Sequence, residues 1–151
     1  HKVLGTNARM TDLQAAIGLV QFAKFDSILE RRAQIAAFYY DRFRRNKSIK
    51  SPKVRKHARN AYFCAPILIE NRDKVAEELR RVGIDTRIAY PMPVYEQPFF
   101  QQFKDKNREY NCHNAKWMTE RVLNLPIFHT ITDEQLNFVV ENVLRIVDCY
   151  A

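Results

Sequence analysis

Two segments of the chain combine residue types that could bind an anion or another polar ligand. The first, residues 5–10, places Asn7 and Arg9 just before a predicted helix. Backbone N–H groups at a helix N-terminus favour an anion, and an amide and a guanidinium could reach that same anion. The second, residues 90–98, contains three prolines and two tyrosines. Its restrained backbone would lose little entropy on holding a ligand.

Other kinds of catalytic site find no support in these residues. The chain has three glycines, too few for a glycine-rich phosphate-binding loop. Its four histidines show no metal-binding spacing with one another or with the cysteines. Cys112 and His113 are adjacent, so on a helix they would point in different directions. No metal site is therefore expected, and a simple turn and a crossover remain alternative explanations of the two segments.

The composition is that of a folded domain. The 151 residues are 46% hydrophobic and 28% charged, which suits a single soluble domain with its own core. No apolar run is long enough to span a membrane, and no signal peptide is evident. The three cysteines are odd in number and form no CxxC pair, so a reducing, cytoplasmic setting is expected. The abrupt start at His1 suggests a piece of a longer protein.

The net charge of +8 is concentrated in one segment, residues 42–59. Such a segment could bind nucleic acid or a phosphate-bearing substrate. The favoured explanation is instead a solvated helix end and loop, where cations suit the helix C-terminus. No aromatic residues interleave with the cations, so nucleic acid is not the favoured partner. The nine cations are Arg42, Arg44, Arg45, Lys47, Lys50, Lys53, Arg55, Lys56 and Arg59.

Hydrophobic periodicity predicts an α+β fold, with a small antiparallel-type sheet covered by helices and preceded by a long linking helix. Thr11 and Gln14 have the spacing of a capping box, and Asp26 is expected to cap a second helix after a bend. Residues 1–46 are assigned to the opening motif and interdomain helices, and residues 47–151 to a small domain.

The elements of that small domain are bounded by turn and capping residues. Pro66 cannot donate to a sheet, so its strand is expected at an edge or bulge. Asn71 is expected to cap a helix that ends at Gly83. The three prolines of residues 90–98 exclude a helix or central strand there. The predicted elements are strands over residues 61–70, 84–89 and 122–125, and helices over residues 72–82, 108–121 and from the Thr132–Gln135 capping box onward.

Taken together, the motifs resemble those of one family. Gly5-x-Asn7-x-Arg9-Met10, continued by Asp12-x-Gln14-Ala15-Ala16-Ile17-Gly18, resembles the signature of the DegT/DnrJ/EryC1/StrS aminotransferases. Later landmarks follow in the same order as in that family. They are Arg31-Arg32 with Ile35-Ala36 and Tyr39, Tyr90-Pro91-x-Pro93 with Gln97-Pro98, Arg121-Val122-Leu123-x-Leu125-Pro126-Ile127, and Thr132-x-Glu134-Gln135.

The resemblance implies the C-terminal portion of a fold-type I enzyme that uses pyridoxal 5′-phosphate (PLP). Such enzymes aminate nucleotide-linked keto-sugars, usually with glutamate as donor, in the biosynthesis of polysaccharides and antibiotic sugars. They work as homodimers with active sites at the subunit boundary. The chain would then supply the small C-terminal α+β domain and the helix that precedes it.

The resemblance also implies roles for individual residues. Asn7 holds the position that reaches the PLP phosphate of the other subunit. Arg9 holds a position that meets anionic groups of the substrate. Tyr90 and Pro91 match the loop that borders the sugar-nucleotide pocket, and so does Tyr95. Many members have histidine where this chain has Tyr95, so recognition of the substrate is expected to differ there.

The Schiff-base lysine of the family lies upstream of the opening motif, and Lys2 is too close to Gly5 to be its counterpart. The chain alone is therefore expected to contain no catalytic residue, to bind no PLP and to be inactive. A non-catalytic binding or regulatory module with the same fold is the alternative. Since a linking helix normally packs on a large domain, Leu13, Ile17 and Val20 are expected to be exposed and to promote self-association.

Overall fold

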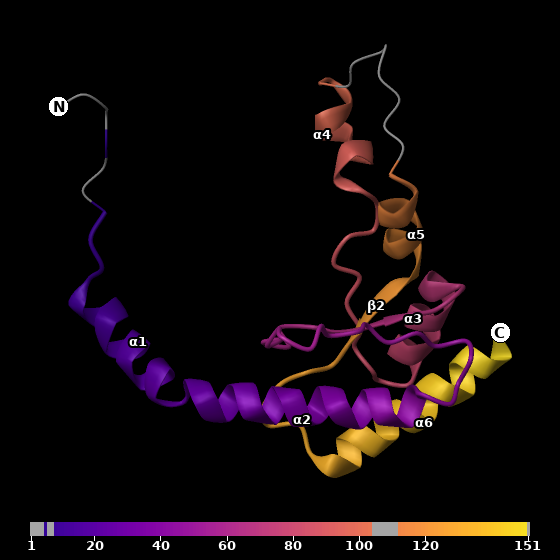
Figure 1. Ribbon diagram of the computed structural model, residues 1–151, viewed down its shortest axis with the longest axis horizontal. Coiled ribbons are helices and arrows are strands. Elements are labelled where there is room, and N and C mark those ends of the chain that lie inside the picture. The colour runs from indigo at the N-terminus through magenta and orange to yellow at the C-terminus, as the bar shows by residue number, and fades with distance from the viewer. Residues whose placement is uncertain (1–4, 6–7, 104–111, 151) are drawn as a thin grey trace.

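The computed structural model describes residues 5, 8–103 and 112–150 of the chain. Its layers are visible in Figure 1: α2 and α6 lie on one side of the small sheet, and α4 and α5 stand on the other. In chain order the elements are α1 (Asp12–Ala23), α2 (Phe25–Phe43), β1 (Ala65–Leu68), α3 (Arg72–Arg81), the 3₁₀ turn η1 (Val94–Glu96), α4 (Pro98–Gln101), α5 (His113–Arg121), β2 (Val122–Leu125) and α6 (Asp133–Cys149). The predicted α+β class is confirmed.

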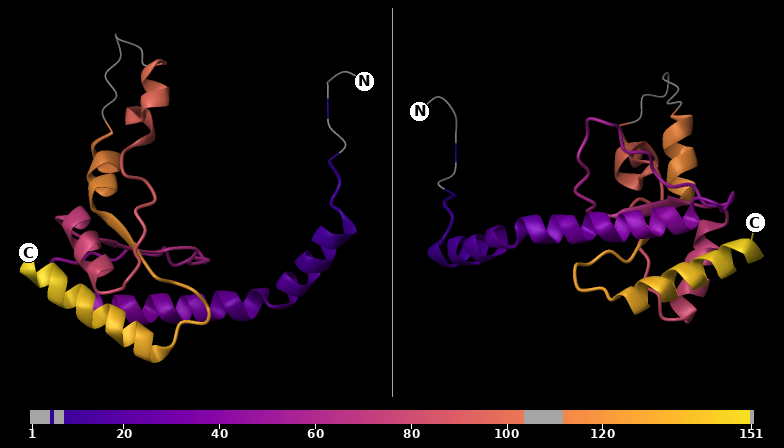
Figure 2. Two further views of the ribbon diagram at one scale, coloured as in Figure 1. Left: turned by 180° about the vertical axis from the view of Figure 1, so that it is seen from behind. Right: turned by 60° about the horizontal axis from the view of Figure 1, so that its bottom comes forward.

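The N-terminal arm consists of α1 and α2, which meet at a bend at Lys24 (Figures 1 and 2). The predicted capping box is confirmed, because the Gln14 N–H donates to Thr11 Oγ1 and the Thr11 N–H donates to Gln14 Oε1. The predicted cap at Asp26 is wrong. Lys24 keeps nearly helical backbone angles (φ −94°, ψ −4°), so α2 restarts at Phe25 without the extended residue that a side-chain cap requires.

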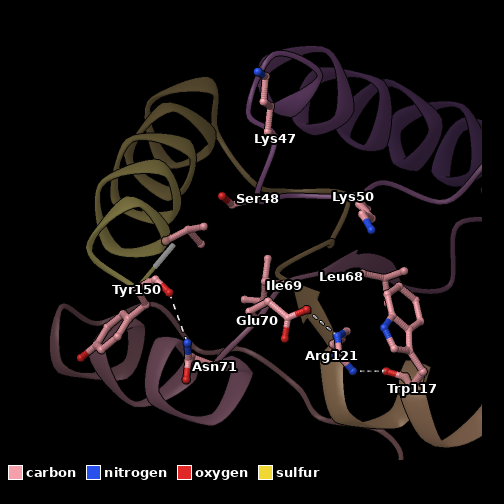
Figure 3. Close-up of a pocket in the computed structure, with 11 residues that line it drawn as sticks. Lys47, Ser48, Lys50, Leu68, Ile69, Glu70, Asn71, Trp117, Arg121 and Tyr150 are labelled. Atoms are coloured by element: carbon pink, nitrogen blue, oxygen red, sulfur yellow. Dashed lines mark hydrogen bonds and ion pairs between the residues drawn. The ribbon is translucent and has the colours of Figure 1, made fainter.

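The sheet has two antiparallel strands, in which Pro66 lies opposite Asn124. Both strands are edges, which agrees with the prediction for a strand containing proline. Beside β1, Lys50 adds one bridge: its N–H donates to the Leu68 carbonyl oxygen at 3.0 Å, and its carbonyl accepts from the Leu68 N–H at 2.8 Å. This bridge places Lys50 next to Trp117 (Figure 3).

Two predicted strands are shorter in the structure. The strand expected over residues 61–70 is limited to β1, because Tyr62 adopts a left-handed backbone (φ 47°) that interrupts the extended chain. The strand expected over residues 84–89 is a single bridge between Arg87 and Asn124. At that bridge the Asn124 side-chain amide also donates to the Arg87 carbonyl oxygen, at 2.9 Å.

The core lies between the second half of α2, the sheet, α3 and α6. The helix predicted after the Thr132–Gln135 capping box is confirmed as α6, and its buried residues follow helical spacing along one apolar stripe. Tyr39 is fully buried, and its hydroxyl donates to the Pro126 carbonyl oxygen at 3.0 Å. The helix α2 therefore belongs to the arm at its beginning and to the core at its end. The largest fully buried side chains are Tyr39, Phe43, Ile35, Ile67, Ile69, Leu79, Leu123, Leu136, Val75 and Val143.

The ends of the remaining helices agree with the sequence in part. Gly83 has φ 84° and ends α3 as predicted. The second capping box, at Thr132, is confirmed by both of its hydrogen bonds. The Asn71 side chain, however, does not cap α3, because its amide donates to the Tyr150 carbonyl oxygen at 3.2 Å. The predicted start of α5, residues 108–111, lies outside the described residues.

The helix α1 has no buried residue in this chain. Leu13, Ile17 and Val20 are 73%, 57% and 54% exposed, which confirms that this face is uncovered here. In the described part of the chain, no helix has the length and the apolar character needed to cross a membrane.

Candidate functional site

The opening segment leads into the N-terminus of α1. Arg9 is exposed there, whereas Asn7 lies outside the described residues. The capping box already occupies the Gln14 N–H, and the carboxylate of Asp12 stands in the first turn. Both features reduce the attraction of the helix end itself for an anion. Any anion bound at this segment would depend mainly on side chains such as Arg9.

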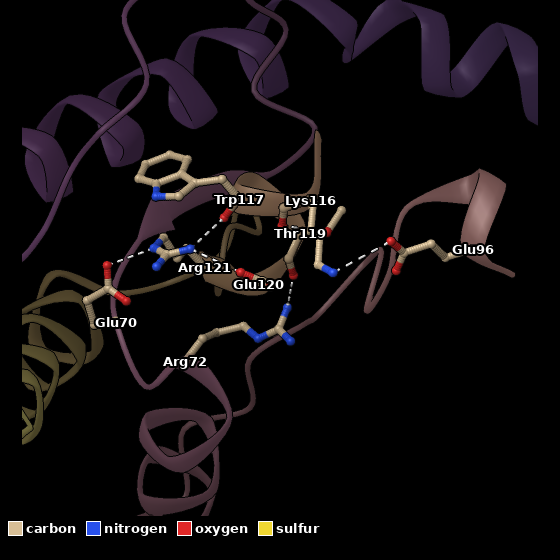
Figure 4. A network of polar contacts seen from close by, with 8 residues as sticks. All are labelled: Glu70, Arg72, Glu96, Lys116, Trp117, Thr119, Glu120 and Arg121. Atoms are coloured by element: carbon tan, nitrogen blue, oxygen red, sulfur yellow. Dashed lines mark hydrogen bonds and ion pairs between the residues drawn. The ribbon is translucent and has the colours of Figure 1, made fainter. Parts of the chain in front are cut away.

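The second segment, residues 90–98, is ordered by a short turn. The Glu96 N–H donates to the Pro93 carbonyl oxygen at 3.0 Å, which forms η1 inside the stretch that was expected to exclude helix. The prediction was wrong for this single turn, which begins after Pro93 and therefore needs no N–H from a proline. The Gln101 amide donates to the Tyr95 carbonyl oxygen at 2.8 Å, and Lys116 Nζ lies 3.9 Å from Glu96 Oε1 (Figure 4).

The candidate substrate residues of this loop differ in exposure. Tyr90 is 59% exposed and Pro91 is exposed, whereas Tyr95 is half-buried. Desolvation raises the pKa of the Tyr95 phenol, and the nearby Glu96 and Cys112 raise it further. The phenol of Tyr95 therefore stays protonated around neutral pH and can donate a hydrogen bond, which a neutral histidine in its place could also do.

One chain does not bring the two segments together. Residues 8–10 of the opening segment lie at the free end of α1, whereas the loop lies beside α4 and α5 (Figures 1 and 2). Three cavities lie elsewhere, and Arg9, Tyr90 and Tyr95 line none of them. Within the described residues, the two segments therefore present two separate partial surfaces.

The residues that could hold PLP fit the cofactor only in part. A phosphate group needs converging cations or N–H groups, and Arg9 offers one exposed guanidinium. A covalent cofactor also needs a lysine inside a closed pocket, and Arg9 lines none of the three cavities described above.

An aromatic cluster beside the loop was missed by reasoning from the sequence. Phe99 contacts Phe100 and Phe103 edge-on, with ring centroids 5.2 and 5.5 Å apart. Phe99 and Phe103 are 64% and 68% exposed. The spacing Phe-Phe-x-x-Phe after Pro98 was a visible signal, because it places three rings on one helical turn. This cluster extends the loop into a larger exposed apolar surface.

Comparisons with known proteins give a consistent result. The model of the DegT/DnrJ/EryC1/StrS aminotransferase family matches residues 1–144. The chain is 34% identical over 150 residues to the protein MJ1066 of Methanocaldococcus jannaschii, covering 95% of this chain and 38% of that protein. It is 30% identical over 147 residues to the GDP-perosamine synthase of Escherichia coli O157:H7, with the same coverage of 95% and 38%.

A solved structure agrees in fold. The crystal structure of S. venezuelae DesV in complex with a ketimine intermediate superposes with a TM-score of 0.86 and 26% sequence identity. The superposition covers 98% of this chain and 39% of that one. The chain thus spans about 38% of the length of the curated relatives described above.

Proposed function

The chain belongs to the DegT/DnrJ/EryC1/StrS aminotransferase family, and we propose that it forms the C-terminal portion of a PLP-dependent sugar aminotransferase. The intact enzyme transfers an amino group from an amino acid, glutamate by expectation, to a nucleotide-linked keto-sugar in polysaccharide or antibiotic-sugar biosynthesis. The observation that carries the proposal is the match of the family model to residues 1–144. Relatives with the same coverage include a GDP-perosamine synthase.

The proposed roles of the residues differ between the two partial surfaces. When PLP is bound in the intact enzyme, it supplies the electron sink for transamination. Asn7 of this chain holds the phosphate group of the cofactor in the neighbouring subunit. Arg9 binds an anionic group of the substrate, for which its exposed position on the arm is suited. Tyr90, Pro91 and Tyr95 border the sugar nucleotide, and the half-buried phenol of Tyr95 orients it through a hydrogen bond.

The chain by itself is proposed to be inactive. In residues 1–151, the position expected for the Schiff-base lysine has no counterpart, since Lys2 stands only three residues before Gly5. We also propose that residues 1–46 form the opening motif and interdomain helices, that residues 47–151 form the small domain, and that the intact protein is a cytoplasmic homodimer. The three cysteines, none of them in a disulfide, are compatible with a reducing compartment.

Spectroscopy tests the proposal. The intact protein should show the absorption band of lysine-bound PLP and should release 2-oxoglutarate from glutamate in the presence of a keto-sugar nucleotide. The 151-residue chain should show no such band. A band in the 151-residue chain that disappears in Lys2→Ala would refute its inactivity. Failure of the intact protein to bind PLP would instead favour a non-catalytic binding or regulatory module.

A mixed-dimer experiment tests the role of Asn7 across the subunit boundary. One subunit carries Asn7→Ala, and the other lacks the Schiff-base lysine. If Asn7 acts on the neighbouring subunit, each heterodimer has one complete site, and random mixing restores about a quarter of wild-type activity in a two-fold symmetric dimer. If Asn7 acts within its own subunit, no site is complete and the mixture stays inactive. Gln21→Ala, on the same arm, is the control and should leave activity unchanged.

A further inference from the structure

A cavity of about 510 Å³ lies between the end of α2, the edge of β1, the end of α5 and the end of α6 (Figure 3). Its volume falls within the range of about 300–1,000 Å³ that is common for small-molecule sites. Its polar lining includes Lys47, Ser48, Lys50, Glu70 and Arg121. None of these residues belongs to the opening segment or to the loop of residues 90–98. The cavity is therefore separate from the surfaces assigned to the sugar aminotransferase reaction.

The lining carries more positive than negative charge. Three cations, Lys47, Lys50 and Arg121, face one carboxylate, that of Glu70. Glu70 is already bound by Arg121, whose Nε donates to Glu70 Oε1 at 2.7 Å. Over the residues that the structure describes, no carboxylate oxygen lies within 4.0 Å of the ammonium of Lys47 or Lys50. Two cations of the cavity thus remain available to an anion.

An aromatic wall stands beside the cations. The ring of Trp117 is 38% exposed and lines the cavity. Lys50 Nζ lies 5.3 Å from its ring centroid and Arg121 Cζ lies 4.9 Å from it. The backbone bridge to Leu68 fixes the start of the Lys50 side chain at the sheet edge. A ligand that joins an anionic group to an apolar or planar part could use both kinds of wall.

We propose that this cavity binds a small phosphate-bearing anion through Lys47 and Lys50, beside the Arg121 guanidinium that Glu70 holds in place. Arg44 and Arg45, which follow α2 just before Lys47, are exposed as well and add positive charge near this end of the cavity. In Figure 3 the Lys47 side chain extends along the end of α2, so it must turn toward the ligand on binding. That movement is available to an exposed lysine, since its stem rotates freely in solvent.

The chain contains a single tryptophan, so the emission of Trp117 reports on this cavity alone. The probes are inorganic pyrophosphate and uridine diphosphate, titrated into the chain at low salt, with equilibrium dialysis as a second measurement of binding. We expect saturable binding of both probes with a change in Trp117 emission. Equal affinities would indicate a site for the inorganic anion, whereas tighter binding of the nucleotide would indicate contact with the aromatic wall.

Matched variants assign the binding to the cavity. Lys47→Met/Lys50→Met removes two lining cations and should weaken binding about tenfold or more, because removing one charge-assisted hydrogen bond weakens binding by roughly a factor of ten. Lys53→Met/Lys56→Met removes the same charge from the same segment outside the lining and should change affinity less than about twofold. No saturable binding, an equal loss of affinity in both double variants, or a loss confined to Arg9→Met would each overturn the proposal.

Discussion

The exposed face of α1 allows a quantitative prediction about assembly. Leu13 and Ile17 lie one helical turn apart and are 73% and 57% exposed, and α1 has no buried residue in this chain. We expect the 151-residue chain to self-associate through this face and the double variant Leu13→Gln/Ile17→Gln to dissociate. The reason is that each side chain would move from water into an apolar contact when two chains meet.

The magnitude follows from the exposed fractions. Complete burial of a leucine or isoleucine side chain is worth about 1.5–3 kcal/mol, and here somewhat more than half of each side chain is still available for burial. That gives about 1 kcal/mol for each side chain. A symmetric dimer contains both side chains twice, so the double variant should lose about 4 kcal/mol, or nearly three powers of ten in the dissociation constant.

Sedimentation velocity over a wide range of concentration measures this effect. Gln21→Ala, an exposed change on the same helix, is the control and should keep the association of the original chain. The reasoning fails if the original chain sediments as a monomer at the highest concentration. It also fails if the double variant associates as strongly as the original while its circular dichroism is unchanged.

Three further predictions concern stability, each measured by urea unfolding. Tyr39→Phe should lower the free energy of unfolding by about 1–2 kcal/mol, because it leaves the half-buried Pro126 carbonyl oxygen without the hydroxyl that donates to it at 3.0 Å; an unchanged midpoint would show that water replaces this donor. Thr132→Ala should lower the free energy of unfolding by about 1 kcal/mol, because it removes the cap of the packed helix α6. Thr11→Ala should leave the free energy of unfolding nearly unchanged, because α1 has no buried residue. Equal effects of the two variants would contradict this reasoning. The Arg121 guanidinium lowers the pKa of Glu70 below its usual 4.5, so this carboxylate contributes stability that is present above pH 4.5 and lost as the pH falls through the folded pKa. Glu70→Gln should therefore flatten the acid side of the stability profile, and an unaltered slope would exclude this pair as its source.

Features determined by local sequence were predicted well. Both capping boxes form, because the Thr hydroxyl and the Gln amide lie within a single turn and need no distant partner. Gly83 adopts the positive φ expected of a helix-ending glycine. The stripe of α6 was readable for the same reason, since its period is a property of one helix.

Features that depend on distant residues were predicted less well. Asn71 was expected to cap α3, but its amide reaches the Tyr150 carbonyl oxygen, which only the packing of α6 brings near. The strand expected over residues 84–89 is only one bridge, in which Asn124 bonds to Arg87 through both backbone and side chain. In both cases the structure departs from the local tendency, capping for Asn71 and a strand for residues 84–89, at a polar contact between residues distant in the sequence.

For the candidate site, the sequence identified residue types but not their arrangement. Nothing in the spacing of Arg9 and Tyr90 says whether the two meet within one chain. The structure answers this through the arm, because α1 and α2 together contain 31 helical residues, 12 and 19 respectively. At about 1.5 Å per residue, the helices before the first buried position, Ile35, extend for roughly 30 Å.

A guanidinium on a flexible stem cannot bridge a separation set by that length of helix. The bend at Lys24 does not fold α1 back onto the small domain, because no residue of α1 is buried. If Arg9 and Tyr90 border the same site, the loop with Tyr90 must therefore belong to another copy of the chain. Otherwise, the rest of the enzyme must complete one site around Arg9 and a separate site around Tyr90. Both arrangements make a lone chain incomplete, and this supports the proposal that the opening segment acts on a neighbouring subunit. The mixed-dimer experiment separates the two arrangements, because only the first lets an intact arm rescue a subunit whose own arm is altered.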